Sequence, residues 1–565
     1  MTVRMTAVSA NEKVHRTGDA PALQTPIYLF KGSSVSFQVN ILTNEYYQDG
    51  AYLRLVGGPA ARAAKLRRVA FIPAVEDVKY GHDDYYVVRE DHLYPDALES
   101  FDPRYIHGVP NVNQTFFVTI EDNDKIPVGE QTVTVRFYDK KKFVKSVKVT
   151  IIKVDEELPA QKCIYTNWIH YDSFISQHGV RLFTPAFYKL FKSYLDAAVI
   201  GGQNMALVPL FTPAFDTEIG CERLTAQLLD ISEPTPGKFV FDFAKTNEFI
   251  KFVLANGIKY LEMPPFFTQW GAKNAPKIMV RNAKGRVVRR FGWETDALSD
   301  EYKSFLDQLL VALNANLREN GWEEISFFHI SDEPHADQAE QYLSCKAFIK
   351  ARVGRSRLLD ACSDLVFAGK DETEYSVCVL NALDKYIEAN VRPLCTYNCC
   401  GPISGYFSNR FLSMPLARMA VLGLQLYRYD IDLFLHWGFN FYNSVHSRRF
   451  INPYCNTDAD GAFTAGDGFI VYPDYAGHGA NPSLRLYAMG ECFRLSRMLY
   501  LLEAKKGRDA ALAFLDAEGV TGLSVYPKKR SSRSSFRVLF LIPSSSTRYF
   551  SSYSGSYLPY LLFSY

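Results

Sequence analysis

The sequence predicts a multidomain protein in which an N-terminal antiparallel β-sandwich precedes a (β/α)8 barrel of the TIM type. Three observations indicate this class. The chain of 565 residues is too long for one ordinary domain. Apolar and polar residues alternate along several segments before about residue 155, and no long helical pattern interrupts them. From residue 162 onward, short apolar runs alternate with helical patterns as far as about residue 505.

The first predicted domain, residues 1–157, contains segments in which every second residue is apolar. This period is typical of strands with one buried face. Turn-forming residues separate the segments, as at 121–124. Several such strands without intervening helices favour an antiparallel sandwich, with a linker at 156–159. The predicted strands are residues 35–41, 116–120, 132–137 and 147–151.

The second predicted domain, residues 160–505, repeats a β-then-α pattern, which indicates a parallel sheet and most simply a closed barrel. A doubly wound open sheet is the alternative, but it usually carries a glycine-rich turn after its first strand, and none follows His170. The predicted strands are residues 163–170, 205–210, 259–263, 325–330, 358–361, 393–397, 433–436 and 469–472, with 374–379 as a further candidate. The predicted helices include residues 185–199, 300–317, 336–351 and 411–427.

The last segment, residues 506–565, begins as ordinary helix and turn and changes character at about residue 528. From there to the end it contains no acidic residue, and serine and tyrosine dominate. Such low-complexity composition predicts a disordered tail. The alternative hypothesis is that this stretch is not authentic, for example because it is read out of frame.

Composition argues against several classes of partner. The net charge of +2 gives no electrostatic basis for binding nucleic acid or an anionic membrane. The first 24 residues lack the apolar core of a signal peptide, and no apolar run is long enough to span a bilayer.

The ten cysteines are scattered, which favours reduced thiols and a cytoplasmic location. Cys395, Cys399 and Cys400 lack the paired spacing of a zinc site, so no metal or cofactor is expected.

Two adjacent carboxylates, Asp332 and Glu333, directly follow the predicted strand at 325–330. In an α/β barrel the carboxyl ends of the strands face the active site. A pair of carboxyl groups there is what a glycosidase uses to protonate a leaving group and stabilise a sugar cation. The structural alternative is a helix start, because Ser331 or Asp332 followed by Pro334 is also a good N-terminal cap.

The other predicted strand ends are rich in aromatic and polar residues, a combination typical of a sugar cleft. Aromatic faces stack on apolar C–H patches while polar groups bind the hydroxyls. A structural role is the alternative for each, because a lone histidine is more often hydrogen-bonded in a core and a tryptophan is often a packing anchor. The candidate substrate-binding residues are His170, Asp172, Gln269, Trp270, Tyr397, His436, Trp437, Asn440 and Tyr472.

Several separated motifs occur in one order along the chain: residues 166–172, 267–271, 329–334, 408–411, 436–438 and 466–469. Together they resemble the DUF4091 family, which is related to glycoside hydrolase family 123. The resemblance covers roughly residues 163–502, with a sandwich ahead of the barrel as in that family. It implies a (β/α)8 barrel and β-N-acetylgalactosaminidase chemistry assisted by the substrate.

The family's adjacent Asp-Glu pair matches Asp332 and Glu333. The resemblance implies that Glu333 protonates the glycosidic oxygen and then acts as base toward water, which requires a raised pKa. Asp332 would accept a hydrogen bond from the substrate's acetamide N–H. Tyr397 would donate to the acetamide oxygen, while Trp270 and Trp437 would wall the acetamide methyl and the sugar face.

The resulting prediction is a hydrolase of terminal β-linked N-acetylhexosamine, with N-acetylgalactosamine as the preferred sugar and a glycan or glycoconjugate as partner. Two alternatives stay open: a non-catalytic sugar-binding protein of the same fold, and a hydrolase for another glycan. The presence of both Asp332 and Glu333 favours the enzyme, since a binding protein has no need of an adjacent acid pair. The sequence does not indicate an oligomeric state.

Overall fold

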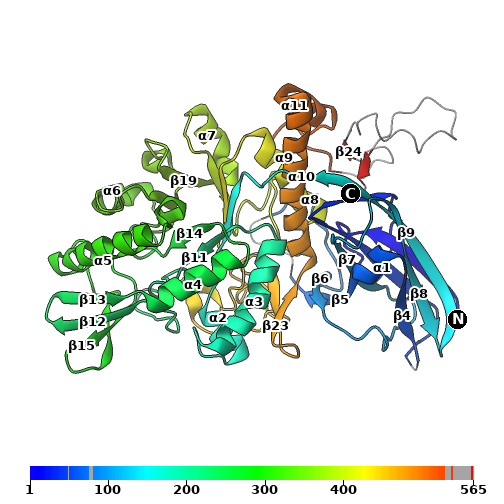
Figure 1. Cartoon of the computed structure of the whole chain (residues 1–565), viewed down its shortest axis with the longest axis horizontal. Coiled ribbons are helices and arrows are strands. Elements are labelled where there is room, and N and C mark those ends of the chain that lie inside the picture. The colour runs from blue at the N-terminus through cyan, green and yellow to red at the C-terminus, as the bar shows by residue number, and fades with distance from the viewer. Residues whose placement is uncertain (49, 76–80, 529–535, 539–560, 564–565) are drawn as a thin grey trace.

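The computed structural model describes residues 1–48, 50–75, 81–528, 536–538 and 561–563. A β-sandwich occupies one end of the molecule and an α/β barrel the other, and helix α10 (Leu484–Lys506) lies between them (Figure 1). This confirms the predicted fold class. Among the described helices, none is long and apolar enough to cross a membrane.

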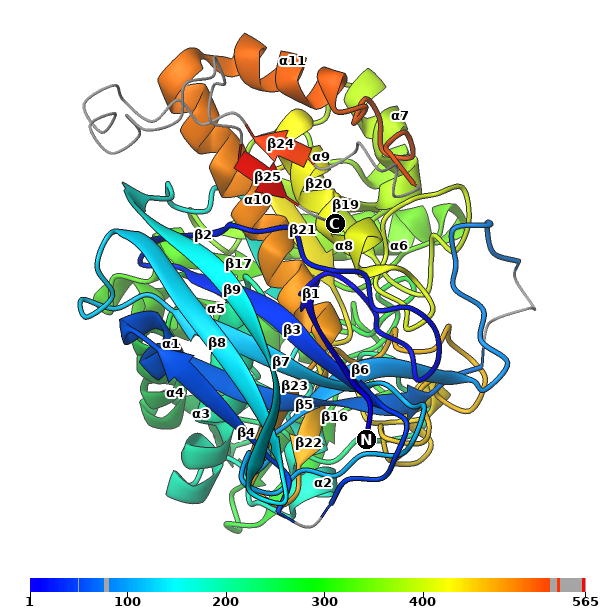
Figure 2. The same cartoon turned by 90° about the vertical axis from the view of Figure 1, so that its right-hand side faces the viewer.

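The N-terminal domain consists of two stacked sheets (Figure 2). Period-two segments bury their apolar side chains between the sheets, and Phe37, Val118, Val135 and Ile151 are all completely buried there. All strand pairs are antiparallel except β2–β9. One sheet has the order β1 (Val3–Ser9), β3 (Ser34–Thr43), β7 (Gln114–Glu121), β5 (Ala64–Pro73) and β6 (Leu93–Glu99). The other has the order β2 (Ile27–Lys31), β9 (Lys142–Glu157), β8 (Gly129–Asp139) and β4 (Tyr52–Gly57), and a short helix α1 (Pro59–Ala63) follows β4.

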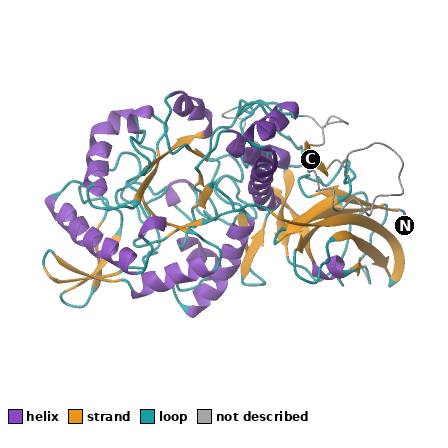
Figure 3. Ribbon diagram, turned by 45° about the horizontal axis from the view of Figure 1, so that its top comes forward, coloured by secondary structure: helices purple, strands orange, loops and turns teal. Residues whose placement is uncertain are grey.

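The second domain is a closed barrel of eight parallel strands, sealed where β21 pairs with β10 in the register Ile164↔Leu433. Figure 3 shows helices surrounding this ring of strands. The strands are β10 (Ile164–Asn167), β11 (Met205–Leu207), β14 (Tyr260–Met263), β17 (Ser326–Phe328), β18 (Arg357–Ala361), β19 (Glu374–Val379), β20 (Cys395–Asn398) and β21 (Leu433–His436). The helices around them are α2 (Asp172–His178), α3 (Pro185–Ile200), α4 (Ala244–Ala255), α5 (Asp300–Glu319), α6 (Ala339–Lys350), α7 (Leu383–Glu388), α8 (Leu416–Ala420) and α9 (Leu422–Arg428).

One predicted barrel strand is wrong. The further candidate at 374–379 is the sixth strand, β19, whereas the apolar run at 469–472 lies outside the ring. It contributes to β22 (Val471–Asp474), which forms an antiparallel hairpin with β23 (Gly479–Pro482). The physical reason is the short connection: a parallel neighbour needs a long crossover, and only four residues separate these strands.

The predicted helix at 411–427 is also shorter than expected. It begins at Leu416, after Pro415, and is divided into α8 and α9. The other predicted helices form, and hydrogen-bonded caps fix where two of them begin. Thr184 and Ser299 each accept a hydrogen bond from the backbone N–H three residues on, at the beginning of α3 and α5.

Two further elements extend the barrel. Residues between β11 and α5 add a small four-stranded sheet at the outer edge, in the order β13 (Lys238–Asp242), β12 (Asp230–Thr235), β15 (Ile278–Asn282) and β16 (Val287–Phe291) (Figure 3). After α10, helix α11 (Arg508–Ala517) packs beside it. Most of the predicted low-complexity tail lies outside the described residues; within it, β24 (Phe536–Val538) pairs with β25 (Leu561–Phe563).

Helix α10 is buried along most of its length, because it contacts the sandwich strand β6 and the barrel helices α3, α8 and α9. Ser483 caps its first turn by accepting a hydrogen bond from the Leu486 N–H at 3.0 Å. Ala97 of β6 forms an isolated antiparallel bridge with the same Ser483. The N-terminal domain therefore contacts the backbone at the start of α10 directly.

Candidate active site

The carboxyl pair lies where the fourth barrel strand, β17, ends. Two backbone hydrogen bonds hold it between neighbouring strand ends. The Glu333 N–H donates to the Ala361 carbonyl at 3.1 Å, and the Trp270 N–H donates to the Asp332 carbonyl at 2.8 Å. Both carboxylate residues are half-buried. The predicted pair thus stands at the carboxyl-terminal mouth of the barrel, where barrel enzymes place their active sites.

The backbone of Glu333 is strained. Its φ of +41° lies in the left-handed region, which a side chain with a Cβ seldom adopts. A non-glycine residue held there costs on the order of 1–3 kcal/mol, and such residues cluster at functional sites. A helix cap needs no such conformation, so this geometry disfavours the interpretation of the pair as a bare cap.

Tyr397, at the end of β20, orients Glu333. Its hydroxyl donates to Glu333 Oε1 at 2.6 Å and lies 3.3 Å from Ser363 Oγ. Burial and the charge of Glu333 raise the pKa of this phenol well above its usual range. Tyr397 therefore stays a neutral hydrogen-bond donor at any physiological pH.

The two neighbouring carboxyl groups do not ionise independently. Burial, followed by the charge of Glu333, raises the pKa of Asp332 well above its usual range, while the charge of His329 opposes the shift. Asp332 therefore tends to keep its proton.

A charged network lies beneath the pair inside the barrel. His329 is completely buried and contacts Glu262 Oε1 through Nε2 and Asp360 Oδ1 through Nδ1, the latter at 2.9 Å. Burial alone disfavours the imidazolium, but the charge of Glu262 and the hydrogen bonds that the ring donates to both carboxylates outweigh it and raise the pKa of His329 to about 10. The ring is therefore an imidazolium, with both N–H groups donating.

Both carboxylates of this network have additional donors, as buried charges require. Glu262 also accepts from Thr166 Oγ1 and from Trp168 Nε1, the latter at 2.7 Å. Asp360 accepts from the Tyr342 hydroxyl at 2.6 Å and from the backbone N–H groups of 330 and 331. Those N–H groups immediately precede Asp332, so the network fixes the chain that carries the pair.

We expect His329→Gln to destabilise the barrel by about 3–5 kcal/mol, because it leaves two buried carboxylates without their cation. Tyr342→Phe is the control: it removes one hydrogen bond to Asp360 and should cost only about 1 kcal/mol. Urea unfolding measures both. Since the pKa of His329 is raised from 6.5 to about 10, its stabilising contribution is complete below pH 6.5 and is lost as the pH rises through about 10. Equal losses in the two variants would contradict an imidazolium at this position.

Trp437 forms one wall of the mouth, and Asp467 holds it. Trp437 is half-buried, and its Nε1 donates to Asp467 Oδ2 at 2.9 Å. His436, next to it, accepts the Gly438 N–H at Nδ1, and burial depresses its pKa far below the usual range. Burial raises the pKa of Asp467 to about 7, in spite of the opposing Arg410 charge, and the charge of Glu333 adds to the rise. Asp467 is thus electrostatically coupled to Glu333.

Trp270 lies on another side of the mouth. It is half-buried and its ring centroid is 5.8 Å from that of His446. Asp216 accepts the His446 N–H at 2.8 Å, and burial raises the pKa of its carboxyl. The charge of Asp216 contributes to the raised pKa of Asp332, so it too belongs to the electrostatic surroundings of the pair.

Four predicted substrate-binding residues have side chains engaged in internal hydrogen bonds. Asp172 forms a bidentate ion pair with buried Arg223, whose Nη2 also donates to His170 Nδ1 at 3.1 Å. His170 therefore donates from Nε2 to the Trp437 carbonyl, and burial, with the Arg223 charge, lowers its pKa to about 3. Asn440 exchanges hydrogen bonds with the His170 backbone, and Gln269 bonds the backbone of 216 and 217.

Tyr472 lies away from the mouth. It is completely buried in the contact between barrel and sandwich, and its hydroxyl donates to Asp96 Oδ2 at 2.6 Å. Its position follows from the hairpin β22–β23, which replaces the barrel strand that the sequence predicts there. The structure therefore gathers Asp332, Glu333, Tyr397, Trp270 and Trp437 at the mouth. His170, with its partners Asp172 and Arg223, contacts the backbone of Trp437.

Sequence reasoning missed Glu262 and Asp360 as members of the site, although a signal was present. Each is a single carboxylate within an apolar strand, in β14 and β18. A lone charged side chain in such a buried run is stable only if it is paired or hydrogen-bonded inside the protein. Asp216 and Asp467 come from loops, and no local pattern placed them beside the pair.

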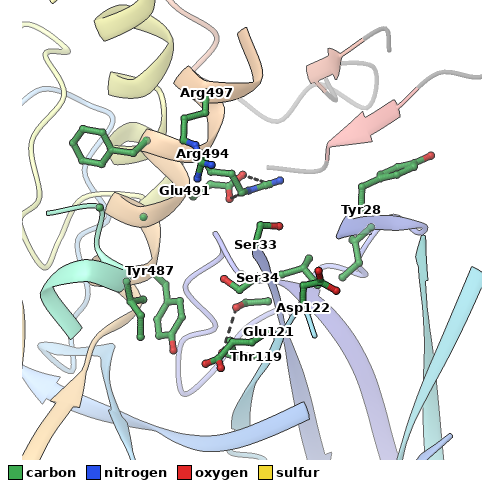
Figure 4. A pocket seen from close by; sticks show the side chains of 18 of the residues that line it. Tyr28, Ser33, Ser34, Thr119, Glu121, Asp122, Tyr487, Glu491, Arg494 and Arg497 are labelled. Carbon is green, nitrogen blue, oxygen red and sulfur yellow. Dashed lines mark hydrogen bonds and ion pairs between the residues drawn. The ribbon is translucent and has the colours of Figure 1, made fainter. Parts of the chain in front are cut away.

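A separate cleft lies between the sandwich and α10. Its volume is about 510 Å³, and it is lined by Ser33, Thr119, Tyr487 and Arg494 among others (Figure 4). Arg494 is paired there with Glu491, at 2.6 Å. The residues that line this cleft include none of the predicted site, so its size does not make it the candidate active site.

No metal centre is evident in the part of the chain that the structure describes: no group of three or more His, Cys, Asp or Glu side chains is arranged to hold an ion there. The arrangement at the mouth is instead two carboxyl groups with aromatic walls. In a closed (β/α)8 barrel, this combination defines a glycoside hydrolase.

The comparison with protein families agrees. The model for the catalytic domain of glycoside hydrolase 123 matches residues 168–502, which is more than half of the chain. The chain therefore belongs to glycoside hydrolase family 123. No curated protein sequence matches it.

Of two solved structures compared with the chain, one shares this fold. A family 123 glycoside hydrolase from Clostridium perfringens, whose structure was used to describe glycolipid glycan hydrolysis, is 14% identical, with 92% of each chain covered and a TM-score of 0.68. A family 39 glycoside hydrolase from Bacteroides cellulosilyticus WH2 is 12% identical, with 84% of this chain and 82% of that chain covered and a TM-score of 0.33. The first shares the fold; likeness at the level of the second says nothing about the substrate.

Proposed function

We propose that this protein is a retaining β-N-acetylhexosaminidase that releases terminal β-linked N-acetylhexosamine, with N-acetylgalactosamine as the preferred sugar. The nucleophile is the substrate's own 2-acetamido oxygen. The observation that supports this most strongly is the adjacency of Asp332 and Glu333 on one strand end, with Glu333 held by Tyr397.

The adjacency bears on the mechanism. A retaining enzyme that supplies its own nucleophile needs two carboxyl groups on opposite sides of the anomeric carbon, about 5–5.5 Å apart. Residues that follow one another at a single strand end are poorly placed to straddle a sugar ring. They suit a substrate that attacks its own anomeric carbon, because the protein then needs no carboxylate at bonding distance from that carbon.

Glu333 is the proposed acid and base. It protonates the glycosidic oxygen as the bond to the leaving group breaks, and then accepts a proton from the water that opens the cyclic intermediate. The Tyr397 hydroxyl on Oε1 fixes the rotamer, so the proton to be transferred resides on the other oxygen. Because that phenol stays neutral, it holds Glu333 through both steps.

Asp332 is the proposed partner of the acetamide N–H. Burial raises its pKa, which favours a protonated carboxyl. An N–H donor from the substrate stabilises the carboxylate and so lowers that pKa. The acetamide group then supplies both the nucleophilic oxygen and the hydrogen-bond donor that favours ionised Asp332.

The surroundings suit a positively charged intermediate. The carboxyl groups of Asp216 and Asp467 couple to the pair, and the aromatic rings of Trp270 and Trp437 offer apolar faces for the acetamide methyl and the sugar. Negative charge around a developing oxazolinium lowers the barrier to its formation.

The test uses matched substrates. We expect p-nitrophenyl β-N-acetylgalactosaminide to be hydrolysed at least about a hundredfold faster than p-nitrophenyl β-galactoside, which lacks the acetamide, and the same difference between the N-acetylglucosaminide and the glucoside. A thiazoline analogue of the cyclic intermediate should inhibit competitively. Equal rates within the matched pairs would refute substrate assistance, and binding of the amino sugars without turnover would favour the non-catalytic alternative.

A further inference from the structure

A β-bulge in the N-terminal domain turns one carboxylate toward the barrel. The ladder of β5 and β6 pairs Ala70 with Ala97 and Phe71 with Pro95, so Asp96 is the extra residue on β6. A bulge re-aims the side chain of the unpaired residue. Asp96 is completely buried, and its strand β6 contacts α10 and the hairpin β22–β23.

Arg485, in the first turn of α10, forms an ion pair with this carboxylate. Its Nε and Nη2 lie 3.0 and 2.9 Å from Asp96 Oδ2, and the guanidinium is completely buried. On its far side, Nη1 donates to the carbonyls of Gly466 at 2.6 Å and Arg410 at 3.0 Å. One guanidinium thus links the sandwich to the turn that precedes Asp467.

The turn is shaped for this contact. Gly466 has a φ of +90°, and a Cβ there would lie 2.7 Å from Arg485 Nη1, so only glycine allows the approach. The following residue, Asp467, accepts the Trp437 Nε1–H at 2.9 Å. A second residue of the N-terminal domain, Lys13, donates to the Leu412 carbonyl, and Leu412 in turn bonds the backbone of Ala465.

We propose that Asp96 is a positioning residue of the active site, acting through Arg485 and the 466–467 turn on the Trp437 wall. The sandwich is then a structural part of the catalytic mouth, although the family's catalytic-domain model begins only at residue 168. The inference rests on the proposed function only in taking Trp437 as a wall of the sugar site.

The experiment compares two buried carboxylates of the same domain. Asp96→Asn keeps the shape and removes the charge that holds Arg485. Asp122→Asn is the matched control, because Asp122 forms a mostly buried ion pair with Lys153 at 2.7 Å but does not contact the barrel turn. We expect Asp96→Asn to lower kcat/KM for the aryl hexosaminide about tenfold, since small displacements of positioning groups have effects of this order. The control should stay within about twofold.

A double-mutant cycle distinguishes positioning from general destabilisation. In a Trp437→Phe background, which lacks the Nε1–H, Asp96→Asn should cost less than about twofold in kcat/KM. Full additivity, or an equal loss in Asp122→Asn, would overturn the proposal. Tyr472→Phe, which removes one hydrogen bond to Asp96 and leaves the ion pair, gives a milder variant should Asp96→Asn fold poorly.

Hydrogen exchange provides a readout that needs no substrate. The amides of Gly466 and Asp467 donate to Thr457 and Thr464 at 2.7 and 3.0 Å. Their exchange should be at least about tenfold faster in Asp96→Asn and unchanged in Asp122→Asn. If the wild-type protein hydrolyses no hexosaminide, the proposed function fails while this comparison still decides the role of Asp96. Unchanged exchange in Asp96→Asn would refute that role.

Discussion

Replacing Glu333 with glutamine should lower kcat by roughly 10²–10⁴-fold on substrates with poor leaving groups, such as alkyl or natural β-N-acetylhexosaminides. The substitution preserves shape and removes the proton donor. With a 2,4-dinitrophenyl leaving group, which departs without protonation, the loss should be much smaller. Steady-state kinetics on both classes of substrate give the comparison.

The dependence on the leaving group is the decisive part. A variant that merely disturbs the mouth would slow all substrates alike, so indifference to the leaving group would count against Glu333 as the acid. Glu340→Gln, on the exposed side of α6 after the same strand, is the matched control and should leave both rates unchanged.

Replacing Asp332 with asparagine should lower kcat by roughly 10²–10³-fold with good and poor leaving groups alike. In the proposed mechanism Asp332 acts on the acetamide rather than on the departing oxygen, so its loss affects formation of the cyclic intermediate with every leaving group. The ratio of rates between the two classes of substrate should stay as in the wild type. A ratio that shifts as it does in Glu333→Gln would contradict the division of roles.

The same Asp332→Asn variant should be more stable than the wild type near pH 7, by about 1 kcal/mol or ~2–4 °C in Tm. The pKa of Asp332 is raised in the folded protein. Below its ordinary pKa of 3.8 the carboxyl is protonated in the folded and unfolded states alike and has no effect on stability. As the pH rises from there through the folded-state pKa, the free energy of unfolding falls. The gain should therefore disappear near pH 3.5. A gain of the same size at both pH values would exclude ionisation as its cause.

The architecture could be predicted from sequence because periodicity reports burial. Alternation over 35–41 and 116–120 marks the faces that the sandwich buries, in β3 and β7. The barrel strands, by contrast, are short apolar runs that resemble other buried segments. In the sequence, the run at 469–472 is therefore indistinguishable from a barrel strand. Only its antiparallel pairing with β23 distinguishes it.

The site could be predicted where a candidate residue lies at or soon after the end of a barrel strand. Asp332, Glu333, Tyr397 and Trp437 do so. The partners that set their geometry come from distant segments: Asp467 lies 30 residues beyond Trp437, and Arg223 reaches His170 from 53 residues away. Such long-range pairs leave no periodic trace, because they depend on how loops close over the mouth.

Polar residues at strand ends can have their hydrogen-bonding atoms engaged inside the protein. His170, Asp172 and Asn440 are polar residues beside the mouth, and these atoms bond Arg223 and backbone groups. Their contact with a sugar stays a prediction. A polar residue at a strand end thus indicates the neighbourhood of the site more securely than contact with substrate.

The left-handed backbone of Glu333 has an evolutionary consequence. Both members of the pair are unfavourable for folding, one through its backbone conformation and the other through its suppressed ionisation. Selection for turnover must outweigh that disadvantage in every generation. A descendant released from this selection would gain stability by mutating either residue and would be expected to lose the pair early. The absence of either residue in a relative would then mark a lineage that had stopped hydrolysing glycans while keeping the fold.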